Sequence, residues 1–490
     1  MNISFDIPLE VSQVTKTLED KGFLAYLVGG CVRDLVMNRK PKDWDITTNA
    51  KPEEIIELFP KTVYENRFGT VTVVNETTKQ PELKHIEITP FRIEGKYSDN
   101  RHPDEIKFSD NIEDDLSRRD FTINSLSYRN NNGQLIDLFG GIKDIKDNII
   151  RSVGSPEERL QEDPLRIMRA IRLSTELGFM INPDLNKAIK NNVNLLEKIS
   201  IERIRDEVSR ITMSPQPMSG YLLMHDLGIL SVIFPELEES IGITQNKDHI
   251  YDVWEHSLRA LQHSATKNWP LHIRLSALFH DIGKPPTRRW VKEKNDWTFY
   301  GHEVVGARMT EKILKRLKFS TKDIVLIVKL VRNHMFFSDI EQITLSAVRR
   351  IINKVGEENV WDLMKVRNCD RIGMGRPKEN PYRLRKYESM IDEALRDPTS
   401  VKMLKIDGNE LVKVLNVKPG PKIGFILHAL LDEVLNNPKK NTQKYLTERA
   451  QKLILLDEND LKKLGDSGKE EKTKKEEEEL KKIRKKHNVS

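Results

Sequence analysis

Two aspartates separated by one residue are the clearest candidates for chemistry in the N-terminal part of the chain. Asp43 and Asp45 flank Trp44 and lead into Ile46. Because side chains two residues apart on a strand point to the same face, the two carboxylates would lie side by side. Mg²⁺ prefers carboxylate oxygens and substrate phosphates, and a pair of ions about 3.5–4 Å apart suits phosphoryl transfer. An isolated pair of aspartates is more often a polar turn, so this interpretation needs further features.

A turn with two glycines precedes the aspartates. Gly29 and Gly30 follow a predicted strand over residues 25–28 and open a predicted helix. Paired glycines at such a place let backbone amides approach a phosphate at the helix N-terminus. Arg33 adds a positive charge one turn later. Two glycines between a strand and a helix are usually only a turn, so it is the combination with the aspartates that indicates a phosphate site.

Two arginine-rich segments follow in the sequence. Arg118 and Arg119 precede Asp120 and an alternating apolar and polar run, as expected for groups that contact a triphosphate or a ribose. Farther along, Glu162 and Asp163 open a helix whose arginines recur every three residues. These arginines are Arg166, Arg169 and Arg172. Either segment alone is typical of surface ion pairs, but all four features in this order are poorly explained by chance.

Taken together, the four segments resemble the motifs of class II tRNA nucleotidyltransferases, the CCA-adding enzymes and their poly(A) polymerase relatives. The likeness extends over about residues 26–177. It implies that Asp43 and Asp45 are the catalytic pair that binds Mg²⁺, and that tRNA, CTP and ATP are the partners. It also implies a set of nucleotide contacts, in which Asp120 lies beside the ribose. These contacts are Gly30, Arg33, Arg119, Asp120, Asp163, Arg166, Arg169 and Arg172.

The family reads the incoming base with the residues that match Asp163 and Arg166, and Arg169 and Arg172 line the same pocket. Elementary chemistry explains why this pair suits cytosine and adenine. A carboxylate accepts a hydrogen bond while the guanidinium beside it donates one. Cytosine and adenine both present an amino donor next to an unprotonated ring nitrogen, whereas uracil and guanine present a carbonyl next to a ring N–H. A buried polar mismatch supports discrimination of up to about 10⁴–10⁵.

Residues 92–103 form a polar segment with glycine and proline, which predicts a mobile surface loop. The segment resembles the flexible loop of CCA-adding members, which enzymes that add only two cytidines lack. The resemblance therefore favours addition of all three nucleotides. Glu87, on the preceding predicted strand, is either a third carboxylate near the metals or, more commonly for such a residue, half of a cross-strand ion pair.

A second group of candidate residues consists of histidines and aspartates spread over several predicted helices. Ligands from different helices can converge in a bundle core and hold one or two transition-metal ions. The series resembles the HD superfamily of metal-dependent phosphohydrolases, although some HD domains serve only structure. The principal ligands implied are His256, His280, Asp281 and Asp370, with His302 and His334 for a second metal. Lys284 is a candidate phosphate contact.

These residues must be positioned by several domains, because 490 residues divide into roughly three. Helix is predicted near residues 11–20, and strands are predicted over residues 25–28, 71–74 and 86–90, whereas long amphipathic helices dominate after residue 157. We therefore expect an α+β fold with a small mixed sheet in an N-terminal head, followed by helical neck, body and tail regions.

The expected boundaries are soft by several residues. They are a nucleotidyltransferase head at 1–150, a helical neck at 151–245, an HD domain at 246–375, a helical tail at 376–460 and a charged extension at 461–490. The tail is expected to bind tRNA, with Lys413, Lys418 and Lys422 as candidates, although a solvated helical hairpin is an equal alternative. The extension is expected to be disordered or a single helix.

Charge, cysteine content and hydropathy restrict the remaining classes of function. The net charge is only +6, so a polyanion must be bound by local patches. Cys31 and Cys369 are the only cysteines, which excludes a disulfide framework and fits a cytoplasmic protein. The longest apolar runs are about half of what spans a bilayer, so no membrane is expected. No protein partner is predicted.

The sequence leaves three alternatives to a CCA-adding enzyme. A poly(A) polymerase would share all four motifs and the Asn124–Leu126 variant, but the histidine series and the 99–103 loop argue against it. A metal phosphohydrolase with a nucleotide-sensing N-terminal domain would keep the same histidines. An RNA-binding chaperone without catalysis is the third alternative, and the intact aspartate pair argues against it.

Overall fold

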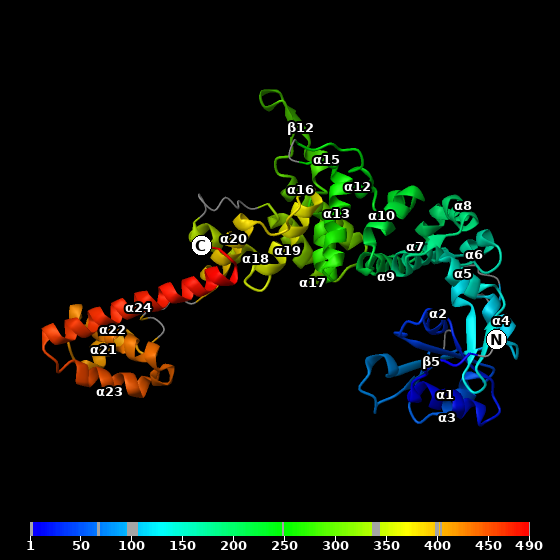
Figure 1. The fold of residues 1–490 in the computed structure, drawn as a ribbon, viewed down its shortest axis with the longest axis horizontal. Helices are drawn as coiled ribbons and strands as arrows, with labels where there is room; N and C mark the ends of the chain where they lie inside the picture. The colour runs from blue at the N-terminus through cyan, green and yellow to red at the C-terminus, as the bar shows by residue number, and fades with distance from the viewer. Residues whose placement is uncertain are drawn as a thin grey trace. The chain divides into compact units, whose positions relative to one another are not determined.

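The computed structural model describes residues 3–65, 69–95, 106–246, 249–335, 344–396, 401 and 404–489. The chain divides into two units. The first comprises residues 1–334 and 365–377, and the second comprises residues 335–364 and 378–490. Figure 1 shows the order of the elements along the chain. Among the described residues, no helix is both long and apolar enough to cross a bilayer.

A seven-stranded sheet in the order β3-β4-β5-β2-β1-β8-β9 forms the centre of the head, which we define as the described part of residues 1–150. Strands β2 and β5 are parallel, and the other neighbours are antiparallel. The strands are β1 (Ala25–Val28), β2 (Trp44–Thr48), β3 (Thr62–Glu65), β4 (Thr70–Val74), β5 (His85–Pro90), β8 (Leu126–Arg129) and β9 (Gln134–Asp137). A separate pair is formed by β6 (Arg92–Glu94) and β7 (Ile106–Phe108).

Short helices surround the sheet and supply the head's apolar cover. They are α1 (Leu9–Glu19), α2 (Gly30–Val36), α3 (Pro52–Leu58), α4 (Ile112–Ser117) and α5 (Gly141–Asp147). Val11, Val14 and Leu18 share one face of α1 at helical spacing, and they pack in one core with Leu27 and Ile46 of the central strands. This core fixes β2, the strand that carries Asp45.

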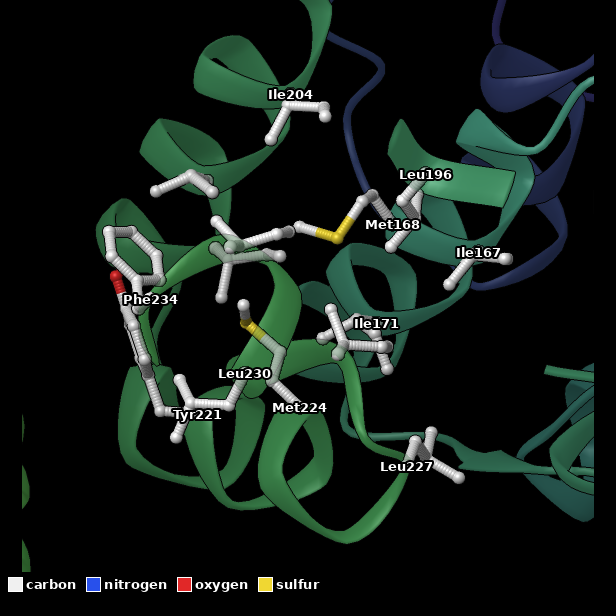
Figure 2. Packing of buried hydrophobic residues seen from close by; sticks show 14 of the residues in the cluster. Ile167, Met168, Ile171, Leu196, Ile204, Tyr221, Met224, Leu227, Leu230 and Phe234 are labelled. Atoms are coloured by element: carbon white, nitrogen blue, oxygen red, sulfur yellow. The ribbon is translucent and has the colours of Figure 1, made fainter. Parts of the chain in front are cut away.

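The rest of the first unit is helical. Its helices are α6 (Pro156–Glu162), α7 (Leu165–Leu177), α8 (Pro183–Asn192), α9 (Ile201–Met213), α10 (Pro217–Asp226), α11 (Ile229–Ile233), α12 (Pro235–Glu238), α13 (Val253–Thr266), α14 (Leu271–Phe279), α15 (Lys284–Thr287), α16 (His302–Arg316) and α17 (Thr321–Asn333). One hydrophobic core runs through these helices from α6 to α17. Figure 2 shows part of this core, where Met168 and Ile171 of α7 pack near Tyr221 and Met224 of α10.

Short strands complete the first unit. Strand β10 (Ile149–Ile150) pairs in parallel with β11 (Met180–Ile181). Strands β12 (Arg289–Val291) and β13 (Asp296–Thr298) form an antiparallel hairpin between α15 and α16. Helix α19 (Val360–Gly373) contributes its second half to this unit. The sheet of the head and the helices that follow it confirm the predicted α+β class.

The second unit is entirely helical in its described part. Its helices are α18 (Leu345–Val355), the first part of α19, α20 (Tyr382–Leu395), α21 (Gly408–Leu415), α22 (Pro421–Asn436), α23 (Gln443–Leu453) and α24 (Glu458–Lys486). Gly465 and Gly468 let α24 approach α22 closely, because a Cβ on Gly468 would lie 2.3 Å from the carbonyl oxygen of His428. At the other end of α24, His487 stacks on Trp361 and contacts Asp392.

Candidate active site and metal centres

Strand β2 presents the predicted pair of aspartates at the middle of the sheet. Asp43 immediately precedes the strand, and Asp45 is its second residue, directly opposite Glu87 of β5 in the parallel register. Burial, followed by the negative charges of Asp43 and Glu87, raises the pKa of Asp45 to about 7. Three carboxylates therefore gather with too little positive charge to balance them, and a divalent cation would supply it. Carboxylate oxygens also suit Mg²⁺, so the residues fit the implied metal.

Gly29 lies beside this site, next to Asp45 and Arg119. Its φ of +80° favours glycine, and a Cβ there would lie 3.2 Å from Nη1 of Arg119 and 3.8 Å from Oδ2 of Asp45. The Arg119 guanidinium and the Asp45 carboxylate thus face the same glycine. The sequence motif predicts Gly30, which begins α2, as the nucleotide contact. Gly29 is the residue whose conformation and surroundings require the absence of a side chain.

Buried Asp115 fixes the two arginines of the second motif. Its Oδ2 lies 2.9 Å from Nη2 of Arg119, and its Oδ1 accepts hydrogen bonds from Arg118. Burial raises the pKa of Asp115, but the two guanidiniums outweigh it and the net shift is downward. An ionised Asp115 is therefore the anchor that aims Arg119 at the carboxylate site. Asp115 lies outside the residues that the sequence motifs predict for the site.

Arg33 is held at the edge of the same site. Its Nη1 donates to Oδ1 of Asn124 at 2.8 Å, and its Nε donates to Oδ1 of the neighbouring Asp34 at 2.9 Å. The opening of α2 therefore connects to the segment that follows Asp120. A Cβ on Gly30 would lie 3.7 Å from Nη2 of Arg33, so this glycine and arginine are neighbours.

Asp120 connects the head to helix α7. Its Oδ2 accepts a hydrogen bond from Nε of Arg169 at 2.8 Å, and its Oδ1 accepts one from the backbone N–H of Phe121 at 2.8 Å. Burial would raise the pKa of Asp120, but Arg169 and Arg166 lower it to about 2. This carboxylate is fully ionised at neutral pH, whereas Asp45 is ionised only in part.

The predicted base-reading pair lies where α6 ends and α7 begins. The backbone N–H of Arg166 donates to the carbonyl of Asp163 at 3.0 Å, so one turn carries both residues. The Asp163 carboxylate is held by Arg203 of α9, with Nη1 and Nη2 at 3.2 and 2.8 Å. The Arg166 guanidinium donates to Glu162 at 2.7 Å and to the carbonyl of Arg118 at 3.2 Å. Arg203 was missed from the sequence, because it lies 40 residues away from Asp163.

Arg172, one turn beyond Arg169 on α7, is buried against Glu207 of α9. Its Nε lies 2.8 Å from Oε2 of Glu207. Burial lowers the pKa of Arg172 and raises that of Glu207, as expected for charges withdrawn from water. In this structure Arg172 braces α7 on α9.

One short segment, residues 118–120, joins the two halves of the predicted site. Arg119 reaches Gly29 beside Asp45, while the carbonyl of Arg118 accepts from Arg166 and the carboxylate of Asp120 accepts from Arg169. The predicted catalytic aspartates and the predicted base-reading turn are thereby linked through a continuous set of contacts. The flexible loop is predicted at residues 92–103. Its start is wrong, because Arg92–Glu94 form strand β6, and its residues 96–103 lie outside the described part of the chain.

The histidines and aspartates of the second constellation converge in one buried cluster. We name this set the HD cluster: His256, His280, Asp281, His302, His334 and Asp370. Asp281 lies at its centre. Its Oδ2 is 3.0 Å from Nε2 of His256, and its Oδ1 is 3.3 Å from Nε2 of His302. The ligand atoms form two groups that share Asp281, and within each group all atoms lie within 4.8 Å of one another.

Three of the histidines have the same orientation. In each ring Nδ1 donates to the backbone carbonyl three residues earlier, which turns Nε2 towards the cluster. The pairs are His280 with Ala277 at 2.7 Å, His302 with Phe299 at 2.8 Å, and His334 with Val331 at 2.7 Å. A second hydrogen bond of this kind is typical of histidines that ligate metals.

The HD cluster also favours a positive charge at its centre. Burial lowers the pKa of His280, but Asp281 and Asp370 outweigh it and raise the pKa to about 10. The pKa of both aspartates lies well below the ordinary value, because neighbouring cations outweigh the effect of burial. Imidazole nitrogens and carboxylates in this arrangement fit divalent transition metals. Lys284 lies 2.6 Å from Oδ2 of Asp281, at the edge of the cluster.

Three family models match successive parts of the chain. The poly A polymerase head domain matches residues 25–151, the probable RNA and SrmB-binding site of polymerase A matches residues 178–241, and the HD domain matches residues 253–375. The first model contains Asp43, Asp45 and the 118–120 segment, and the third contains the whole HD cluster.

Curated relatives cover nearly the whole chain. The CCA-adding enzyme of Lactobacillus helveticus is 33% identical over 449 residues, which are 90% of this chain and 98% of that protein. This decides the family. The chain belongs to the CCA-adding enzymes. The CCA-adding enzyme of Ligilactobacillus salivarius is also 33% identical, over 92% of this chain and 98% of its own. The resemblance inferred from the four motifs is thereby confirmed.

A solved structure extends the comparison to the fold. The crystal structure of the Bacillus stearothermophilus CCA-adding enzyme in complex with CTP has a TM-score of 0.58 and 25% identity, and it covers 91% of this chain and 99% of its own. As a CCA-adding enzyme family member, the chain is a nucleotidyltransferase with an HD domain, and both domain types imply the use of divalent metals.

Proposed function

We propose that this CCA-adding family member adds C, C and A to the 3′ end of tRNA, using CTP and ATP and no nucleic-acid template. The observation that carries the proposal is the hydrogen bond from Arg166 to the carbonyl of Arg118, because the next residue, Arg119, faces Gly29 beside Asp45. Relatives named as CCA-adding enzymes over almost the full length support the same activity. The tRNA is the proposed partner, and no protein partner is proposed.

In the proposed reaction, the 3′-hydroxyl of the RNA attacks the α-phosphate of the nucleotide and releases pyrophosphate. Asp43 and Asp45 would hold Mg²⁺, which when bound activates the hydroxyl and neutralises charge on the phosphates. Arg119 and Arg33 orient the triphosphate beside Gly29, where no side chain blocks its approach. Glu87 supplies a third carboxylate to take up the proton of the hydroxyl. Positioning accounts for much of the rate.

The choice of base is assigned to Asp163 and Arg166. The Asp163 carboxylate accepts from the amino group of cytosine or adenine, and Arg166 donates to the ring nitrogen beside it. Two neighbours hold the pair in place: Arg203 donates hydrogen bonds to the Asp163 carboxylate, and Glu162 accepts one from the Arg166 guanidinium. Asp120, Arg169 and Arg172 support the same region of α7, with Asp120 beside the ribose. A rigid pair of this kind acts as a template made of protein.

One incorporation assay tests this function. The protein with Mg²⁺ and a tRNA that ends at the discriminator base is offered labelled CTP, ATP, UTP or GTP, singly and together. Growth by three nucleotides with CTP and ATP is expected, and UTP and GTP are expected to add nothing. Long tracts of A on unrelated RNAs would instead indicate a poly(A) polymerase and contradict the proposal.

The cytoplasm is the proposed location.

A second activity is proposed for the HD cluster. Its buried imidazoles and carboxylates support hydrolysis of a phosphate ester at an RNA end, such as a 2′,3′-cyclic phosphate. His256, His280, Asp281 and Asp370 would hold one divalent transition-metal ion, and His302 and His334 would complete a second site with Asp281. Bound metal would supply a hydroxide at neutral pH. Lys284, beside Asp281, would contact the phosphate.

The test of the second activity uses RNA that ends in a 2′,3′-cyclic phosphate. We expect its hydrolysis after loading with Ni²⁺, Mn²⁺ or Co²⁺, and loss of hydrolysis in Asp281→Asn. Nucleotide incorporation should be unchanged in that variant. An inert wild-type protein with every metal would indicate an HD domain that serves structure only.

A further inference from the structure

The β12–β13 hairpin carries a surface that neither proposed activity uses. It connects α15 to α16, and a short 3-10 turn over Lys292–Lys294 joins its strands. Figure 1 shows β12 beside α15 and α16, with the hairpin extending away from these helices. The element lies between Lys284 and His302, so both of its ends lead directly into the HD cluster.

Contacts at the base attach the hairpin to the HD cluster. On the outgoing side, Lys284 lies 2.6 Å from Asp281 and 5.6 Å from the centre of the Phe299 ring. On the returning side, the carbonyl of Phe299 accepts from Nδ1 of His302. The two sides meet at Gly283, where a Cβ would lie 2.2 Å from the carbonyl oxygen of His302. The position of the hairpin is therefore fixed relative to the metal ligands.

Aromatic rings are exposed along the hairpin. Trp290 is 48% exposed and Tyr300 is 72% exposed. Trp290 pairs across the strands with Trp297, with ring centres 5.2 Å apart and an interplanar angle of 74°. This edge contact stiffens the hairpin and still leaves about half of Trp290 open to solvent.

Basic side chains accompany the rings. Between residues 288 and 300 there are four basic residues, Arg288, Arg289, Lys292 and Lys294, against two acidic ones. The Arg288 guanidinium lies 3.7 Å from the centre of the Trp297 ring, and Nζ of Lys294 donates to the Tyr300 hydroxyl at 2.7 Å. Arg289, Lys292 and Lys294 are exposed.

Internal stability of the hairpin explains only part of this composition. The stack of Arg288 on half-buried Trp297 and the edge contact with Trp290 would hold the strands together. Neither contact needs an exposed Tyr300 or three exposed cations. Exposed rings with basic residues between them are the combination that binds single-stranded nucleic acid, because bases stack on the rings and phosphates meet the cations.

We propose that the β12–β13 hairpin binds a single-stranded RNA end, with bases stacked on Trp290 and Tyr300 and phosphates at Arg289, Lys292 and Lys294. The binding itself is independent of the two proposed activities. Delivery of the RNA end to the HD cluster rests on the proposed phosphohydrolase function. In that setting the hairpin is a binding element, and the chemistry stays with the metal ligands and Lys284.

Photo-crosslinking locates the contact on the full chain. A single-stranded RNA of about eight nucleotides with 4-thiouridine near its 3′ end is irradiated with the protein in EDTA, and crosslinked peptides are sequenced by mass spectrometry. We expect crosslinks to Trp290 or Tyr300, and their loss when unlabelled single-stranded RNA competes. Crosslinks found only elsewhere in the chain would overturn the proposal.

Affinity measurements separate stacking from charge. Trp290→Ala with Tyr300→Ala should weaken binding of the same RNA about tenfold or more, since each stacked base contributes substantially. Lys292→Ala with Lys294→Ala should reduce the slope of log affinity against log salt by about 1.4, for two phosphates on a single strand. Lys312→Ala with Lys322→Ala, on exposed positions of α16 and α17, is the matched control and should change neither quantity.

A kinetic comparison distinguishes failure of this proposal from failure of the phosphohydrolase. If the wild-type protein hydrolyses the cyclic phosphate, the Trp290 and Tyr300 double substitution should raise KM for the RNA about tenfold. Hydrolysis of the small substrate bis(p-nitrophenyl) phosphate should be unchanged. If the wild type hydrolyses nothing, the crosslinking result still decides whether the hairpin binds RNA. If the Trp290 and Tyr300 double variant binds the RNA as tightly as the wild type, the proposal is contradicted. A hairpin that binds a protein and no RNA would give this result.

Discussion

The head site and the HD cluster are two concentrations of acidic residues in one chain, and the pKa values of their aspartates shift in opposite directions. In the head, Asp45 is buried beside Asp43 and Glu87, and its pKa rises to about 7 because of this burial and of the two neighbouring negative charges. In the HD cluster, Asp281 is buried among histidines and Lys284, and its pKa is well below the ordinary value.

The difference teaches how each site would hold metal. The head carboxylates lie at the middle of a sheet, and bound Mg²⁺ keeps part of its shell for waters and substrate phosphates, so ions can come and go with the nucleotide. The HD cluster surrounds its centre with ligands from five helical elements and turns three Nε2 atoms inward through hydrogen bonds to carbonyls. Such a site is expected to retain its ions between reactions.

The largest effect that would test this comparison is loss of nucleotidyl transfer. Asp43→Ala removes one of the proposed Mg²⁺ ligands, and we expect incorporation of CMP to fall at least about a thousandfold, because several kcal/mol of charge stabilisation is lost. Single-turnover incorporation with labelled CTP measures the loss. Hydrolysis of a cyclic phosphate by the same variant should be unaffected. A parallel loss of both activities would contradict two separate sites.

The next largest effect concerns metal retention in the HD cluster. Wild-type protein dialysed without chelator should keep about one or two transition-metal ions per chain, and Asp281→Asn should lose them, because both ligand groups include Asp281. Elemental analysis of the dialysed proteins measures the difference. Asp43→Ala serves as the control and should keep the ions. Equal metal content in all three proteins would contradict the assignment.

A smaller effect is expected where Arg203 holds Asp163. Arg203→Ala removes the two hydrogen bonds that fix this carboxylate, so we expect kcat/KM for CTP to fall about 10- to 100-fold. Arg210→Ala, on the same helix and paired with Glu176, should reduce it much less. Steady-state kinetics with a tRNA that lacks CCA compares the two. Equal effects would show that Arg203 acts only through helix stability.

The smallest predicted effects are on stability of the metal-free head, and they have opposite signs at two aspartates. The Asp45 carboxyl loses its proton near pH 7 in the folded chain, against its ordinary value of 3.8, so stability falls as the pH rises between these values. Asp45→Asn should therefore raise the free energy of unfolding at pH 8 by about 1–3 kcal/mol.

Asp120 provides the contrast. Its pKa of about 2 means that its ionised form stabilises the fold above about pH 4 and that this contribution is lost as the pH falls towards 2. Asp120→Asn should lower stability at pH 8 by a similar amount. Hydrogen exchange of the sheet amides in EDTA, at pH 5 and pH 8, measures the head by itself. Changes of the same sign for both variants would contradict the assigned charges.

Much of the fold could be predicted from local patterns. The strands expected at residues 25–28, 71–74 and 86–90 correspond to β1, β4 and β5, because apolar and β-branched runs specify buried strands. The order of the sheet and the parallel pairing of β2 with β5 could not be predicted in the same way. They arise from contacts between segments about 40 residues apart in sequence, which local patterns do not encode.

The candidate site divides along the same line. Asp43, Asp45 and the 118–120 segment carry local motifs, so sequence reasoning found them. Asp115 and Arg203 have no such motif: each acts only because folding brings it against a motif residue. Their signal in the sequence is an unexplained charge on an amphipathic helix. Which of the two glycines must lack a side chain likewise depends on the backbone angle φ. This angle is positive at Gly29, and a pair of glycines in the sequence does not specify it.

The central claim is that protein side chains select the nucleotide, and one measurement tests it most directly. Single-turnover incorporation of all four nucleotides is compared between wild type and Asp163→Asn, with a tRNA that ends at the discriminator base. We expect the ratio of the CTP rate to the UTP rate to be at least about tenfold smaller in the variant than in wild type, because the amide of the new Asn side chain can donate to the carbonyl of uracil. A variant that incorporates CTP at the wild-type rate, with UTP still rejected as strongly, would contradict it.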